Sequence, residues 1–72
     1  MPKLPRFTGK EMVKFLARRG FMVVRVRGSH HVMQNGKLRT VVPVHGNSQL
    51  RIGTLRGILR DVEMHPDDFN NP

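Results

Sequence analysis

The chain has 72 residues, no cysteine and a formal net charge of +8. This length suits one small domain, and the missing cysteines exclude disulfides and thiolate zinc sites, as expected for a protein of the reducing cytoplasm. No stretch approaches the roughly 18 apolar residues of a membrane span, and the first six residues lack the apolar run of a signal peptide.

The positive charge is concentrated in residues 1–60, where thirteen Lys and Arg accompany one acid, Glu11. The other four acids lie in the last twelve residues. A field of this kind attracts polyanions and speeds their encounter with the protein. The predicted partner is nucleic acid or an acidic protein, and the alternatives are a membrane surface or a charge that only keeps the protein dissolved.

A first helix is predicted over residues 9–19. Thr8-x-x-Glu11 matches a capping box at its start, and Gly20 is a typical stop after its end. Its apolar positions recur at helical spacing: Met12, Phe15 and Leu16.

Three strands are predicted next, at about 21–27, 30–34 and 37–42. Residues 21–27 alternate in a two-residue repeat, which is typical of a strand with one buried face. Gly28-Ser29 reads as a turn, and Asn35-Gly36 predicts a type I′ hairpin turn. We expect an antiparallel meander that ends at Pro43.

Helical spacing returns over about 52–63, with Leu55, Ile58, Leu59 and Val62 on one face. Residues 65–72 form a polar, acidic tail in which 66–69 could make one helical turn. The predicted fold class is α+β. It is a single domain over residues 1–72, with the order helix, three-stranded antiparallel sheet, helix, and with both helices on one face of the sheet.

His30 and His31 should point to opposite faces of the second strand. A two-residue loop at 35–36 places Gln34 opposite Lys37 and puts His31 on the more apolar face, toward the helices. His30 then lies on the open face near Arg39. A bulge after Gly28 would exchange the two histidines.

This pair predicts acid–base chemistry on RNA, because histidine gives and takes protons near neutrality. A neutral imidazole accepts the proton of a ribose 2′-OH, the oxygen attacks the adjacent phosphorus, and a second donor protonates the leaving oxygen. Nearby cations stabilise the transition state. The alternative is one solvated histidine and one that fills a strand position.

No metal or other cofactor is predicted, because neighbouring strand residues face apart and His30 and His31 would struggle to share an ion with His45. His45 is instead a candidate second proton-transfer group. The candidate RNA-binding residues are Arg25, Arg27, Gly28, Ser29, Lys37, Arg39, Lys10, Lys14 and His45. With four Phe and neither Tyr nor Trp, contacts to phosphates and 2′-OH groups are favoured over base stacking.

Three segments resemble the HicA toxins of bacterial type II toxin–antitoxin pairs, with a match over about residues 8–64. They are Arg19-Gly20-Phe21 with Val24-Arg25-x-Arg27-Gly28-Ser29-His30-His31, then Thr40-Val41-Val42-Pro43-x-His45, and Gly53-Thr54-Leu55-Arg56-x-Ile58-Leu59-Arg60.

The resemblance implies a double-stranded-RNA-binding-domain-like fold and an mRNA endonuclease that arrests translation. It also implies a HicB-like antitoxin partner that masks the active site. It assigns the catalytic role to His30 and His31 as a pair, and it assigns to Gly28 the role of the turn residue that positions the catalytic histidine. Strand alternation favours His30 within the pair. The chain departs from many relatives by continuing beyond the second helix, and a non-catalytic RNA-binding module of the same fold is the alternative function.

Overall fold

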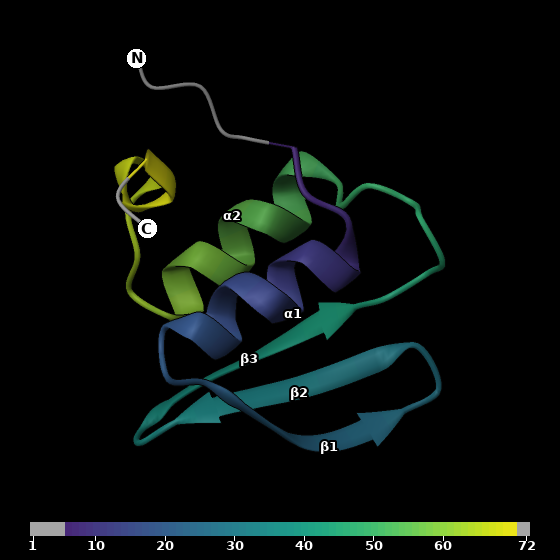
Figure 1. The fold of residues 1–72 in the computed structure, drawn as a ribbon, viewed down its shortest axis with the longest axis horizontal. Coiled ribbons are helices and arrows are strands. Elements are labelled where there is room, and N and C mark those ends of the chain that lie inside the picture. The colour runs from purple at the N-terminus through teal and green to yellow at the C-terminus, as the bar shows by residue number, and fades with distance from the viewer. Residues whose placement is uncertain (1–5, 71–72) are drawn as a thin grey trace.

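The structure is a computed structural model that describes residues 6–70, and it places two helices on one face of a three-stranded sheet (Figure 1). In chain order the elements are α1 (Gly9–Arg18), β1 (Met22–Arg27), β2 (His30–Asn35), β3 (Leu38–Pro43), α2 (Ile52–Asp61) and a 3-10 helix, η1 (Pro66–Asn70). The sheet is antiparallel with the order β1-β2-β3. The predicted α+β class is therefore confirmed, while the last two residues of the predicted tail lie outside the described range.

The capping box predicted for α1 is present. The Thr8 hydroxyl accepts from the backbone N–H of Glu11 at 3.2 Å, and the Glu11 carboxylate accepts from the backbone N–H of Thr8 at 2.9 Å. These reciprocal bonds satisfy two donors that the first helical turn leaves unpaired.

The core lies between the helices and the two strands β2 and β3. Its buried apolar side chains are Met12, Leu16, Phe21, Met33, Val42, Leu55, Ile58, Leu59 and Val62. Thr40, which is also buried on β3, donates its hydroxyl to the Asp61 carboxylate at 3.0 Å and so ties the sheet to the end of α2.

The predicted hairpin register is wrong by two residues. The loop is Gly36-Lys37, so Gln34 lies opposite Arg39 and not opposite Lys37. A type I′ turn needs positive φ at both loop residues, but here only Gly36 has it (φ 59°), as in a type II′ turn. Asn35 stays in β2, where its side-chain amide donates to the Arg19 carbonyl at 3.3 Å. Because the error is an even number of residues, the predicted faces of the sheet still hold.

The prediction of a buried face for β1 is wrong, since all six of its residues are exposed. The helices lie over β2 and β3, which leaves β1 as an uncovered edge (Figure 1). The strand also carries a bulge at Val24, because Val23 pairs with Met33 while Arg25 pairs with Val32.

Among residues 6–70, no helix is long and apolar enough to cross a membrane.

Candidate active site

His30 is the first residue of β2 and directly follows the Gly28-Ser29 turn, as predicted. It lies between Arg27 of β1 and Pro43 of β3, on the face of the sheet away from the helices. Its side chain is exposed, and so is that of Arg27. Both the imidazole and the guanidinium are therefore accessible from solvent.

The turn before His30 is joined to the segment that follows β3. The Ser29 carbonyl accepts from the Val44 N–H at 2.6 Å, and the Ser29 hydroxyl lies 3.3 Å from Nε2 of His45. Since His30 is the next residue after Ser29, these contacts bring a second imidazole to the same corner of the sheet.

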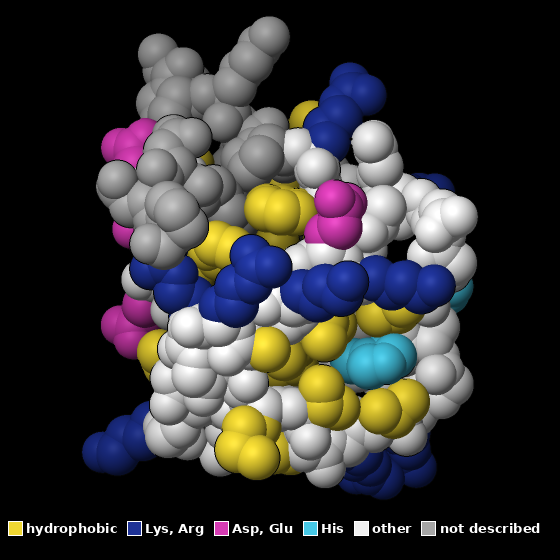
Figure 2. All heavy atoms as spheres, viewed as in Figure 1, with side chains coloured by type: hydrophobic (Ala, Val, Ile, Leu, Met, Phe, Trp, Pro, Cys, Tyr) yellow, Lys and Arg dark blue, Asp and Glu magenta, His cyan; other side chains and the backbone are white. Residues whose placement is uncertain are grey.

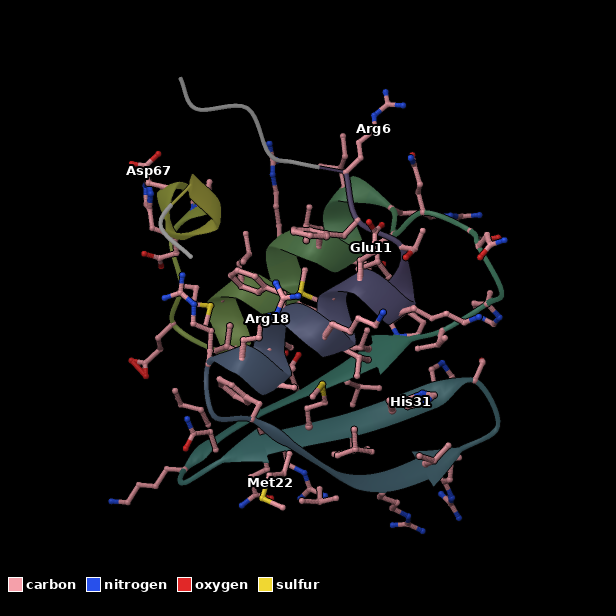
Figure 3. All side chains as sticks on the ribbon, viewed as in Figure 1. Arg6, Glu11, Arg18, Met22, His31 and Asp67 are labelled. Carbon is pink, nitrogen blue, oxygen red and sulfur yellow. The ribbon has the colours of Figure 1, made fainter. Side chains whose placement is uncertain are left out.

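His31 lies on the other face, paired with Val26 and Val42. Figure 3 shows it on the helix side of the sheet, beneath α1. Figure 2, drawn in the same view, shows a histidine ring surrounded by hydrophobic side chains below a row of Lys and Arg side chains. The side chain is half-buried, and its buried Nδ1 has no hydrogen-bond partner among the described residues.

The predicted RNA-binding residues do not form one surface. Arg25, Arg27 and Arg39 share the outer face with His30, because their cross-strand partners lie on that face. Lys10 and Lys14 are exposed residues of α1, on the side of the sheet that carries His31.

Two predicted placements need correction. Lys37 lies in the hairpin loop rather than on a strand, at the end of β2 remote from His30. Arg39 lies opposite Gln34, toward that same remote end. The cation beside His30 is therefore Arg27, and the expected proximity of His30 to Arg39 is wrong because it depended on the shifted register.

A pocket of about 400 Å³ adjoins His45, and Arg51 and Thr54 from the start of α2 contribute to its lining. Neither residue was predicted for the site. The sequence signal that could have indicated Arg51 is a positive charge with no acidic residue nearby in the sequence, placed immediately before the second predicted helix. Within the described residues, no three His, Asp or Glu side chains are grouped so that they could hold a metal ion.

These features combine an α+β domain, exposed histidines and a face rich in arginine. Residues 9–64 match the family described as "HicA toxin of bacterial toxin-antitoxin", which defines the class as the toxin of a toxin–antitoxin pair. The match covers most of the chain, from the start of α1 to just beyond α2, and the chain belongs to the HicA toxin family. A comparison with curated proteins gives no match.

Proposed function

We propose that the chain is a toxin that cleaves mRNA by histidine acid–base catalysis, with His30 as the general base. The observation that carries this proposal is the exposed His30 imidazole next to Arg27, with His45 held at the same corner by Ser29. The proposal includes mRNA as substrate, a HicB-like antitoxin as partner, action in the cytoplasm, and no metal or other cofactor.

The reaction follows from these groups. Neutral His30 takes the proton of a ribose 2′-OH while that oxygen bonds to the adjacent phosphorus. The bond from phosphorus to the 5′ oxygen then breaks, and protonated His45 gives this oxygen its proton. The products are a 2′,3′-cyclic phosphate and a 5′-OH end. Arg27 stabilises the negative charge on the phosphorane-like transition state.

His31 has a different role in this proposal. Its ring fills the helix-side face between Val26 and Val42, on the opposite side of β2 from His30. Single substitutions therefore separate the two histidines, even though they are neighbours in sequence.

The test is cleavage of labelled mRNA in EDTA by the wild type, His30→Ala, His31→Ala, His45→Ala and the His30→Ala/His31→Ala double variant. Loss of a proton-transfer group costs about 10²- to 10⁴-fold in rate, so we expect such a loss for His30→Ala and the double variant. His45→Ala should show a loss in the same range, because His45 is the proposed proton donor, and His31→Ala should retain activity. Circular dichroism checks that each variant is folded. A folded double variant that cleaves at the wild-type rate would contradict the assignment.

A non-catalytic RNA-binding module is the second candidate, and the open arginine face is the observation that favours it, since Arg25, Arg27 and Arg39 could hold phosphates without any reaction. The same assay distinguishes the two functions. Salt-sensitive binding with intact RNA after long incubation would support the binding module.

A further inference from the structure

β1 leaves one long edge of the sheet open. Within residues 6–70, the backbone of residues 22–27 forms main-chain hydrogen bonds to β2 alone, and no helix covers the strand. An edge strand of this kind presents unpaired N–H and C=O groups that another strand can join. In Figure 1, β1 borders solvent along its full length.

The two faces of this edge differ in character. On the helix side, Val23 and Val26 are 42% and 54% exposed, and they pair with Met33 and His31. On the outer face, Arg25 and Arg27 are exposed without an ion-pair partner among the described residues. A complementary strand would therefore alternate apolar and acidic residues, with the apolar ones toward the valines and the acidic ones toward the arginines.

We propose that the edge of β1 accepts such an acidic, alternating β-strand from the antitoxin, so that the bound partner extends the sheet. The proposal rests on the proposed function for the existence of this partner. Charge complementarity selects the occupant, because like charges on facing strands destabilise a pair while opposite charges stabilise it.

The same charges disfavour pairing with a second copy of the chain. Two β1 strands side by side would bring Arg25 and Arg27 together with their equivalents, in a chain of net charge +8. The other sheet edge is a poorer acceptor, because the helix-side residues Thr40 and Val42 of β3 are buried and Thr40 is bonded to Asp61.

Strand addition also explains how a partner could neutralise the toxin. The added strand would lie about 5 Å from β1, and so roughly 10 Å from the β2 backbone at His30. Its acidic side chains would pair with Arg27 and repel the phosphates of an approaching RNA. The catalytic corner would be closed without direct contact with His30.

The experiment is hydrogen exchange of the toxin alone and in complex with the HicB-like antitoxin of the same locus. Amides of residues 22–27 that point away from β2 should become strongly protected in the complex. Protection confined to other elements would overturn the proposal. Protection of 22–27 in the toxin alone at rising concentration, or on adding RNA, would assign the edge to a second copy or to RNA and would also overturn it.

Val26→Asp tests the edge directly, because Val26 lies on the side of β1 that would face the apolar residues of the added strand. Val26 also lies outside the proposed catalytic corner. It should weaken antitoxin binding at least tenfold and leave RNA cleavage unchanged. Ile52→Asp is the control, because Ile52 is 62% exposed at the start of α2, and it should bind normally. Unchanged binding by a folded Val26→Asp would overturn the proposal. If the wild type leaves RNA intact while 22–27 are protected, the endonuclease proposal fails and strand addition stands.

Discussion

Both helices end in the same hydrogen-bonded turn, but with different residues in it. The Phe21 N–H donates to the Leu16 carbonyl at 3.0 Å after α1, and the Met64 N–H donates to the Leu59 carbonyl at 2.9 Å after α2. The residue before each donor is left-handed: Gly20 has φ 92° and Glu63 has φ 56°. Glycine adopts this region freely, whereas a side chain there costs roughly 1–2 kcal/mol.

Glu63→Gly should therefore stabilise the protein by about 0.5–1 kcal/mol, because relief of this strain outweighs the extra freedom of glycine in the unfolded chain. Urea unfolding measures the change. Glu63→Ala is the control, since it removes the carboxylate and keeps a Cβ. Equal stabilisation by the two variants would show that charge, and not backbone conformation, causes the gain.

Individual residues of the site were only partly predictable. Strand alternation correctly separated His30 from His31, because the direction of a side chain in a strand is a local property. The Ser29–His45 contact and the place of Arg51 beside it join segments distant in sequence. No local pattern contains them.

At the scale of elements, the start of α1 contains a titratable group, the Glu11 carboxyl of the capping box. The pKa of Glu11 is lowered from its usual value chiefly because the carboxylate accepts the backbone N–H of Thr8, with further contributions from the Thr8 hydroxyl bond and the charge of Lys14. A carboxyl group whose pKa is depressed by folding stabilises the native state above its unfolded pKa. This contribution is lost as the pH falls through the lower, folded value.

We therefore expect Glu11→Gln to destabilise the protein at about pH 6 and to lie closer to the wild type at about pH 3, because the contribution of the ionised carboxyl is progressively lost as the pH falls below the unfolded pKa towards the lower, folded value. Thermal unfolding midpoints at the two pH values measure this difference. Glu63→Gln serves as the control for loss of an acid outside the capping box. A gap between Glu11→Gln and the wild type that persists unchanged in acid would refute the ionic contribution.

The order of elements was predictable because capping, helical spacing and strand alternation are local signals. The exposure of β1 was not, since it depends on how far the helix layer extends across the sheet. The prediction of the hairpin register was wrong for a related reason. Asn35 remains in β2 and bonds to Arg19, sixteen residues away, and a local turn preference does not include that contact.

For the whole molecule, the two faces of the sheet are alternative surfaces for the proposed RNA. The outer face carries His30 and three arginines, while the helix side carries His31 and the lysines of α1. The acidic η1 lies away from both histidines. Arg19, the C-cap residue after α1, holds it by donating to the Asp68 carbonyl at 2.7 Å, and Figure 3 shows Asp67 at the end of the molecule opposite His31. η1 therefore leaves both basic surfaces open.

Salt dependence distinguishes the two faces, because each phosphate contact adds about 0.7 to the slope of log affinity against log salt concentration for a single strand. In a His30→Ala background that binds RNA without cleaving it, Arg25→Gln/Arg39→Gln should flatten this slope by about 1.4 if both arginines contact phosphates. Lys10→Gln/Lys14→Gln removes the same charge from the helix side and should leave the slope unchanged. Fluorescence anisotropy with a short single-stranded RNA measures both. A flatter slope for the lysine variant alone would move the RNA to the helix side and make His31, not His30, the histidine nearest the scissile phosphate.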